Sequence, residues 1–162
     1  MKGIIERIKV YTIKGDAGKE MPEARLIENL GLEGDRHAKG GERQISLLLS
    51  ECREQITNEK ETGLCLARFK ENINIRFLDP AAIKPGIHLE IGEAEQKVVL
   101  EITGEIKRCF NECALYQAGK PCPLAGQNLF AKVLKGGVIR VGDGVTLINP
   151  EDNKQMVDNS KR

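Results

Sequence analysis

The sequence lacks an excess of charge of either sign. It carries 25 lysine and arginine residues against 24 aspartate and glutamate residues, which gives a formal net charge of +1. Nucleic-acid binding depends on surplus basic residues that neutralise phosphates, so this balance argues against a nucleic-acid partner. No apolar run approaches the roughly 20 residues that a membrane-spanning helix needs. We therefore expect no membrane segment.

The sequence also lacks the pattern of an export signal and that of a disulfide framework. The N-terminal residues Met1–Arg7 carry charges where a signal peptide has an apolar core, which leads us to expect a cytoplasmic protein. Five cysteines is an odd number, and in that compartment the count favours free thiols. The length of 162 residues suits one domain, which we place at residues 1–150, followed by a polar tail at 151–162.

What the sequence does contain is a series of short Ile- and Val-rich segments separated by glycine turns. Such alternation of apolar and polar residues is typical of half-buried strands. The expected strands are Gly3–Ile13, Ala24–Ile27, Arg43–Leu49, Asn72–Phe77, His88–Ile91, Lys97–Thr103, Val138–Val141 and Val145–Ile148. Many short strands at this spacing predict a mainly β or α+β fold. A small closed β-barrel is favoured, because closure leaves no exposed sheet edge.

Helical signals are few. Ser50 is a candidate N-cap for a helix from Glu51 to about Glu61. Two shorter helices are expected near Glu112–Gln117 and Gln127–Leu134, whereas Gly63–Phe69 is expected to be irregular. With only two or three short helices and poor alternation of strands and helices, a doubly wound parallel sheet is disfavoured.

Three of the five cysteines, Cys109, Cys113 and Cys122, fall within fourteen residues. Lys107 and Arg108 precede the first, and cations beside a thiol favour the thiolate, which attacks electrophiles or binds metal. The cluster favours a nucleophilic, persulfide-carrying or metal-binding thiol at Cys109, with Cys113 on the same face if the intervening residues are helical. Two alternatives stay open. The cysteines would simply pack in the core, or form a zinc site, although C-x3-C-x8-C lacks the paired C-x2-C knuckles of common zinc sites.

The loop Gly31–Gly41 is rich in glycine and charge, and Arg43 follows it. Glycines allow the backbone to approach a ligand, and arginine offers a planar fork to phosphate or carboxylate, so Arg36 and Arg43 are candidate anion contacts. An ordinary turn with solvated charges is the alternative. His37 would serve as a general base or an anion contact, and the alternative is that it does neither, as is more common for a lone histidine in a loop. The amide of Asn72 would hydrogen-bond the edge of a heterocycle or cap a turn.

Taken in order, several short segments of the chain resemble one family. The segments are Gly31-Leu-Glu-Gly-Asp-Arg-His-Ala, Arg43-Gln-Ile-Ser-Leu-Leu, Phe69-Lys-Glu-Asn-Ile, Pro85-Gly with Leu89-Glu-Ile-Gly, Val99-Leu-Glu-Ile-Thr with Cys109, and Gly136-Gly-Val-Ile-Arg-Val-Gly-Asp. Their order resembles the MOSC domain, the C-terminal domain of molybdenum-cofactor sulfurases, in its small stand-alone bacterial form. The resemblance runs from about Gly3 to about Asn149.

This resemblance implies a fold of the pyruvate-kinase barrel type, binding of a molybdopterin-type cofactor, and sulfur handling through one cysteine. That cysteine falls on Cys109, and in relatives with molybdenum bound the matching thiolate ligates the metal. Many relatives have proline before it, where this chain has Arg108. The candidate cofactor-binding residues are Arg36, His37, Arg43, Asn72, Lys107 and Arg108.

The leading hypothesis is a protein that binds the molybdenum cofactor and uses Cys109 to carry or deliver sulfur as a persulfide, or to ligate molybdenum. The resemblance covers no pyridoxal-phosphate domain, so that cofactor would belong to a separate cysteine desulfurase. Molybdoenzymes or cofactor-biosynthesis proteins would be the other partners. The alternatives are a small molybdenum-dependent reductase of N-hydroxylated compounds and a non-enzymatic zinc or thiol redox module.

Overall fold

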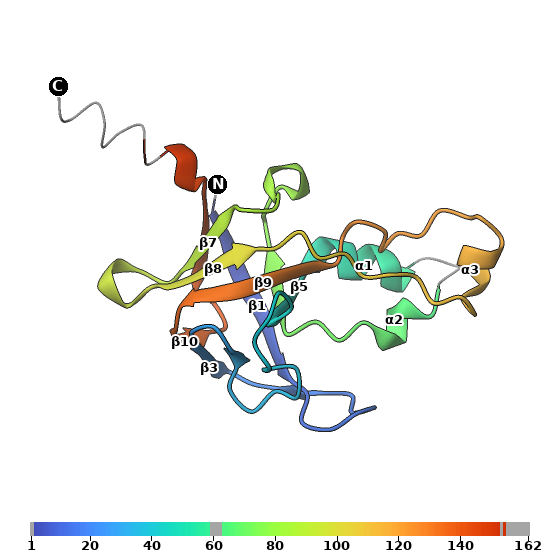
Figure 1. Cartoon of the computed structure of the whole chain (residues 1–162), viewed down its shortest axis with the longest axis horizontal. Coiled ribbons are helices and arrows are strands. Elements are labelled where there is room, and N and C mark those ends of the chain that lie inside the picture. Colours follow the sequence, from blue (N-terminus) through green and yellow to red (C-terminus); the bar gives the residue numbers. More distant parts are fainter. Residues whose placement is uncertain (1, 59–62, 153, 155–162) are drawn as a thin grey trace.

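The structure, a computed structural model, describes residues 2–58, 63–152 and 154, and its centre is a closed β-barrel (Figure 1). The barrel strands are β1 (Lys2–Val10), β5 (Ile45–Leu49), β6 (Ile73–Arg76), β7 (His88–Ile91), β8 (Val98–Ile102), β9 (Leu129–Lys135) and β11 (Gly144–Ile148). They pair in the order β11-β7-β8-β9-β5-β6-β1, and β1 pairs back onto β11 to close the barrel. All these pairs are antiparallel except β5 with β6. The predicted small closed barrel is confirmed.

A second, smaller sheet packs beside the barrel. It consists of β3 (Glu23–Ile27) between β10 (Gly137–Arg140) and β4 (Gly31–Leu32), while the short β2 (Lys19–Glu20) extends the pairing of β1. The chain passes from β9 to β10 at Gly136, where a Cβ atom would lie 2.5 Å from the carbonyl oxygen of Leu26. Only glycine therefore allows this close approach of the two backbones.

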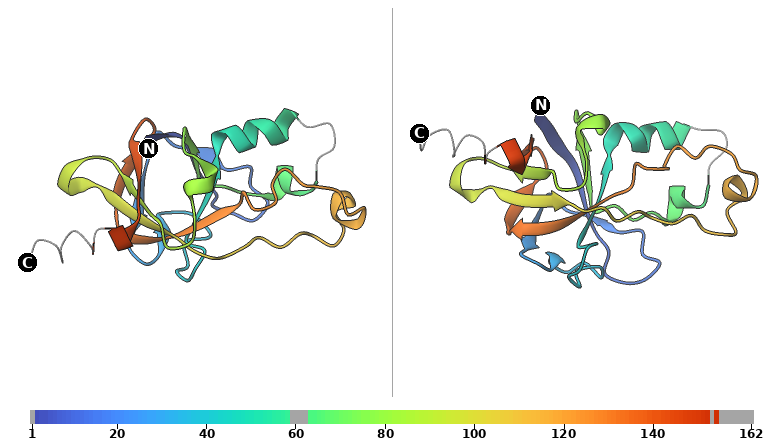
Figure 2. Two further views of the ribbon diagram at one scale, coloured as in Figure 1. Left: turned by 90° about the horizontal axis from the view of Figure 1, so that it is seen from above. Right: turned by 45° about the horizontal axis from the view of Figure 1, so that its top comes forward.

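The helices gather on one side of the barrel (Figure 2). α1 (Ser50–Asn58) and α2 (Cys65–Arg68) lie in the connection between the parallel strands β5 and β6, and α3 (Ala114–Gln117) lies in the long connection from β8 to β9. Two 3-10 turns lie at Pro80–Ala82 and Ala94–Gln96. Within the described residues, we find no helix whose length and hydropathy would suffice for a membrane crossing.

The barrel interior is filled by aliphatic side chains at alternating strand positions. In β8, for example, Val98, Leu100 and Ile102 are buried while Val99 and Glu101 are only half-buried. Complete burial of such a side chain stabilises the fold by about 1.5–3 kcal/mol. The period-two pattern that predicted the strands is therefore the pattern of the core.

The helix predicted near Gln127–Leu134 is wrong, because this segment is the central strand β9. Its residues Phe130, Ala131 and Val133 are buried, and it pairs with β8 on one side and β5 on the other. A helix at this place would leave the backbone groups of two barrel strands without partners, which costs more than the weak local preference gains. Tertiary pairing therefore decided the conformation.

Two other predictions of secondary structure need adjustment. Gly63–Phe69 is not wholly irregular, since Cys65–Arg68 forms the single turn α2. The helix predicted from Glu51 begins at Ser50 and is described to Asn58, and its predicted end near Glu61 lies outside the described residues. The short helix predicted near Glu112–Gln117 is present as α3.

Candidate functional site

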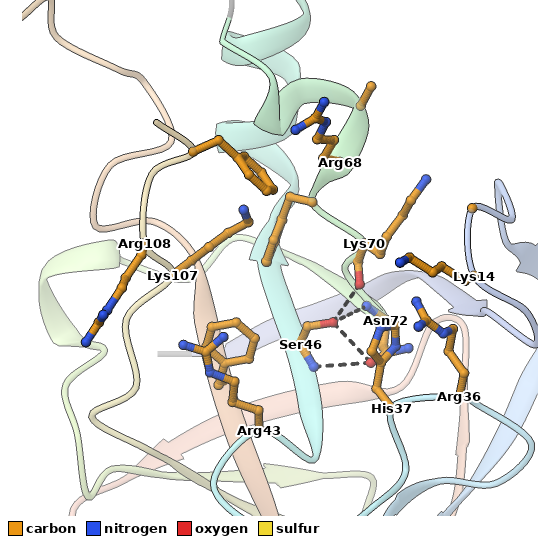
Figure 3. A pocket seen from close by; sticks show the side chains of 15 residues that line it. Lys14, Arg36, His37, Arg43, Ser46, Arg68, Lys70, Asn72, Lys107 and Arg108 are labelled. Carbon is orange, nitrogen blue, oxygen red and sulfur yellow. Dashed lines mark hydrogen bonds between the residues drawn. The ribbon is translucent and has the colours of Figure 1, made fainter. Parts of the chain in front are cut away.

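A pocket of about 730 Å³ opens where the long connections meet the barrel. Its walls come from the loop after β1, the loop between β4 and β5, the chain from α2 to β6, and the connection from β8 to α3 (Figure 3). These segments are distant in sequence, so the pocket exists only in the folded chain.

The pocket is strongly cationic. Its basic lining residues are Lys14, Arg36, Arg43, Arg68, Lys70, Lys107 and Arg108, joined by His37. Among the described residues that line it, none is aspartate or glutamate. Because the whole chain has a net charge of only +1, the fold has concentrated cations here that the composition did not reveal. Such a concave cationic surface attracts anions.

Two of these cations are held by carboxylates from the β8–α3 connection. Arg43 pairs with Glu105 at 3.0 Å, and its guanidinium lies 4.6 Å from the ring centroid of Phe130. Arg68 pairs with Glu112 at 2.9 Å. Arg43, predicted as a cofactor contact, thus lines the pocket while it also anchors the opposite wall.

Other cations in the pocket carry no such partner. Lys14, Arg36, Lys70 and Arg108 form no ion pair with any carboxylate of the described part of the chain. In Figure 3, Lys14, Arg36 and Lys70 lie together on one side of the pocket, across from Arg108. These uncompensated charges make this side the best place for a phosphate or another anion.

Aromatic rings form the apolar part of the lining. Phe69, Phe110 and Phe130 line the pocket, and Phe69 meets Phe130 edge to face with ring centroids 6.3 Å apart. Flat rings beside cations suit a ligand that combines a planar heterocycle with anionic groups.

The buried carboxylate of Asp35 organises the floor of the pocket. Its Oδ2 accepts hydrogen bonds at 2.9 Å from the backbone N–H of Tyr11 and at 2.9 Å from the amide of Asn72. Its Oδ1 accepts one from the backbone N–H of His37 at 2.8 Å and lies 2.8 Å from Nδ1 of the same residue. Since its side chain is only 1% exposed, these bonds replace the water that the charge has lost.

The same contacts set the charge of Asp35 and the orientation of His37. Burial raises the pKa of Asp35, but the hydrogen bonds from the His37 ring and from the two backbone N–H groups outweigh it, and the pKa is lowered. The carboxylate holds Nδ1 of His37, which leaves Nε2 for a ligand or solvent. His37 thus lies in the pocket, as predicted, in an orientation that suits contact with an anion.

Asn72 lines the pocket, as predicted, but its amide is already hydrogen-bonded within the protein. The amide hydrogens are donated to the carbonyl oxygen of Lys9 at 3.1 Å and to Asp35, and its Oδ1 accepts from the backbone N–H of Ser46. Ser46 in turn donates its hydroxyl to the carbonyl oxygen of Lys70 at 2.8 Å (Figure 3). Asn72 therefore positions the pocket wall, and its predicted contact with a heterocycle edge stays a prediction.

A buried ion pair supports this wall from behind. Glu71 forms a two-point contact with Arg53, with distances of 2.8 Å and 2.6 Å. Arg53 also donates to the carbonyl oxygen of Leu66 at 2.9 Å, which ties α1 to α2. In the motif Phe69-Lys-Glu-Asn, Phe69, Lys70 and Asn72 therefore line the pocket, while Glu71, with Asn72, holds the motif in place.

Cys109 does not line the pocket. It is exposed, whereas Lys107, Arg108 and Phe110 around it contribute to the lining. The sequence suggested that Lys107 lies beside the Cys109 thiol. In the structure, the Lys107 ammonium instead lies 3.3 Å from the sulfur of Cys65. Within the described residues, no hydrogen bond reaches the Cys109 sulfur.

The three clustered cysteines occupy different surroundings. Cys113 is buried at the N-terminus of α3, where backbone N–H groups of Tyr116 and Leu64 lower its pKa, and Cys122 packs against the core. The chain from Cys109 to Cys113 is not helical, so the two do not share a helix face. No group of three His, Cys, Asp or Glu side chains in the described ranges is placed to hold a metal. This counts against the zinc hypothesis.

Sequence reasoning missed three of the basic lining residues. These are Lys14, Arg68 and Lys70. Lys70 belongs to the family motif Phe69-Lys-Glu-Asn, but it was not predicted as a ligand contact. Lys14 lies in a turn, and Arg68 lies in a segment that was predicted to be irregular. Their sequence context carried no signal, because only the fold brings them to the pocket.

Comparison with known families decides the relationship of this chain. A model of the MOSC domain matches residues 34–146. The chain belongs to the MOSC domain family. Members of this family are associated with the molybdenum cofactor, which accords with a cationic and aromatic pocket. Among curated proteins, none matches this MOSC chain.

Solved structures share the fold at low sequence identity. The YuaD protein from Bacillus subtilis has a TM-score of 0.67 at 17% identity, over 91% of this chain and 96% of its own. YiiM from Escherichia coli has a TM-score of 0.55 at 18% identity, over 91% and 70%. YiiM from Geobacillus stearothermophilus has a TM-score of 0.56 at 17% identity, over 90% and 75%. At such identities the likeness shows the fold alone.

Proposed function

We propose that this MOSC protein binds the molybdenum cofactor in its cationic pocket and uses Cys109 to carry sulfur or to ligate molybdenum. The lining of the pocket carries this proposal, because it combines basic side chains and phenylalanine rings without a described carboxylate. The cofactor is a phosphorylated pterin, which is anionic and contains flat rings. The two features of the ligand match the two features of the lining.

The residues suited to the phosphate are Lys14, Arg36 and Lys70. Their charges are not compensated by described carboxylates, and they lie on one side of the pocket. His37, oriented by Asp35, adds a nitrogen to the same lining. The phenylalanines would pack against the pterin, and the protein would thereby fix the ligand at both its anionic and its aromatic parts.

Cys109 is the residue suited to sulfur chemistry, because its thiol is exposed on the segment that forms one pocket wall. A persulfide on a partner desulfurase would give its outer sulfur to the Cys109 thiolate. The sulfur–sulfur bond of the donor breaks, a new one forms at Cys109, and the donor leaves as a thiolate. The bound cofactor would supply a molybdenum centre that accepts soft sulfur ligands.

Native mass spectrometry on anaerobically purified protein, mixed with cofactor released from a donor molybdoenzyme, tests cofactor binding. We expect a mass gain of one cofactor in the wild type, a strong reduction in Arg36→Gln, and no change in Arg140→Gln. Arg140 is a suitable control because it pairs with Glu23 on the small sheet. Equal loading of wild type and Arg36→Gln would contradict the assignment of this pocket.

A separate measurement tests the role of Cys109. After incubation with a cysteine desulfurase and cysteine, the Cys109 peptide should gain the mass of one sulfur atom, and the gain should be lost on treatment with a reductant. The Cys109→Ala variant should bind no transferable sulfur, whereas Cys122→Ala should behave as the wild type. Sulfur found on the other cysteines to the same extent would remove Cys109 from this role.

A further inference from the structure

Arg43 and Arg68, the two pocket arginines that form ion pairs, both bind carboxylates of the same segment of the chain. We call residues 105–112 the Cys109 segment. At its start, Glu105 pairs with Arg43 at 3.0 Å, and at its end, Glu112 pairs with Arg68 at 2.9 Å. Both arginines line the pocket. The exposed cysteine therefore sits between two ion pairs whose basic partners face the ligand space.

Little else fixes this segment. It contains no helix or strand, and in the described part of the chain no backbone–backbone hydrogen bond reaches residues 104–109. Its further contacts are a hydrogen bond from Arg43 to the carbonyl oxygen of Ile106 at 2.8 Å, the packing of Arg68 and Lys107 on the ring of Phe110, and the contact of Lys107 with the Cys65 sulfur at 3.3 Å. At its C-terminal end, the carbonyl oxygens of Phe110 and Asn111 also accept hydrogen bonds from the α3 region. The position of residues 105–109 therefore depends mainly on side chains of the pocket.

We propose that Arg43 and Arg68 are positioning residues that couple anion binding in the pocket to the placement of Cys109. An anion in the pocket competes with Glu105 and Glu112 for the two guanidinium groups. When the anion takes them, both ends of the Cys109 segment are released, and the thiol can turn from solvent to the pocket. The significance of this coupling rests on the proposed function, because it brings the sulfur to the ligand only once the ligand is bound.

The exposure of the ion pairs makes this exchange feasible. The side chains are 47% and 39% exposed in the Arg43–Glu105 pair and 46% and 60% exposed in the Arg68–Glu112 pair. Exposed pairs of this kind contribute little to stability, whereas a phosphate can form two-point contacts with a guanidinium. A multivalent anion is therefore expected to displace the carboxylates.

Linkage predicts the effect of removing the carboxylates. If they compete with the anion, Glu105→Gln and Glu112→Gln should each tighten anion binding by about 1.5- to 5-fold. The matched control is Glu23→Gln, since Glu23 pairs with Arg140 at 3.0 Å with comparable exposure and contacts no pocket arginine. This control changes the net charge equally and should bind the anion only slightly more tightly than the wild type.

The experiment uses the full chain without cofactor and inorganic pyrophosphate as the probe, with chloride at equal ionic strength for comparison. Calorimetry gives the pyrophosphate affinity, and the alkylation rate of Cys109 is followed by peptide mass spectrometry. Cys122, which packs against the core, serves as the reference thiol. We expect pyrophosphate to change the Cys109 rate at least twofold, with the half-saturation found by calorimetry, and to leave Cys122 unchanged.

The Glu105→Gln/Glu112→Gln double variant should show the altered Cys109 rate without any anion. Pyrophosphate binding with an unchanged Cys109 rate would overturn the coupling and leave the pocket assignment standing. So would equal affinities of the wild type and the double variant. Failure of the wild type to bind pyrophosphate at all would instead overturn the anion site on which both proposals depend.

Discussion

Two walls of one pocket are built in opposite ways. The wall that carries the half-buried Ser46 and the buried Asn72 rests on the buried carboxylate of Asp35, and hydrogen bonds join these side chains to one another and to the backbone. The opposite wall, the Cys109 segment, has no regular secondary structure and is anchored by exposed ion pairs. The first wall is therefore fixed by buried hydrogen bonds, whereas the second is held mainly by exposed ion pairs, which are weak.

This contrast separates the residues that hold the pocket from those that would act in it. A buried charge must be fully compensated, and therefore it cannot move without a large loss of free energy. An exposed ion pair can be exchanged for a ligand at little loss. A protein that holds a cofactor on one side and moves a thiol on the other needs both arrangements.

The largest effect is expected from Asp35→Ala. This change leaves the N–H groups of Tyr11, His37 and Asn72 without their buried acceptor, so the free energy of unfolding should fall by about 3 kcal/mol or more. Urea unfolding followed by circular dichroism measures it. The exposed-pair variant Glu112→Gln provides the comparison from the other wall. A loss for Asp35→Ala below about 1 kcal/mol would show that the buried wall is not the rigid one.

The next effect concerns affinity and not stability. Arg36→Gln removes an unpaired cation from the pocket and should weaken pyrophosphate binding about 10- to 100-fold, as loss of a charge-assisted hydrogen bond does. Its melting temperature should stay near that of the wild type. Calorimetry measures the affinity, and the control is Arg7→Gln, because Arg7 pairs with Glu20 and neither residue is part of the pocket lining. Equal weakening in both variants would point to net charge alone.

A smaller effect is expected from pH. The folded state lowers the pKa of Asp35 below its ordinary value of 3.8. Its stabilising contribution is therefore complete above that value and is lost as the pH falls through the lowered pKa of the folded state. Between about pH 5 and about pH 2, the wild type should lose stability more steeply than Asp35→Asn, in denaturant titrations at each pH. Parallel slopes would mean that another carboxylate governs acid unfolding.

The smallest effect is expected from Glu112→Gln. The hydrogen bond from Arg68 lowers the pKa of Glu112, but the pair is exposed, so the free energy of unfolding should stay close to that of the wild type. Hydrogen exchange should nevertheless accelerate in the Cys109 segment and stay unchanged around Asp35. A stability loss as large as that of Asp35→Ala would abolish the distinction between the two walls.

Most of the fold could be predicted from the sequence, because its strands follow the simple alternation of a barrel wall. For example, the bounds of strands β7 and β8 agree to within one residue with the predicted strands His88–Ile91 and Lys97–Thr103. Besides the two-residue strands β2 and β4, the exception is β9, whose residues Leu129–Lys135 mix apolar and basic side chains in a pattern that fits a helix as well as a strand. The neighbours β5 and β8 settled this ambiguity, and they are remote in sequence.

The site could be predicted only in part. Arg36, His37, Arg43 and Asn72 were predicted from the family motifs, Lys107 and Arg108 from their place beside Cys109, and all six line the pocket. Side-chain direction could not be predicted, since it depends on contacts between remote segments. Lys107 turns to Cys65, and Cys109 turns outward.

The sequence by itself determined the strand pattern, the excess of glycine at turns, and the order of motifs that marks a MOSC domain. These properties are local or linear along the chain, so they can be recognised without coordinates. Only the tertiary structure decided that a chain of nearly balanced charge has a pocket without a described carboxylate, and that its cysteine stands outside that pocket. The physical reason is that local charge density and side-chain direction depend on which remote segments pack together, whereas the composition gives only the total charge of the chain.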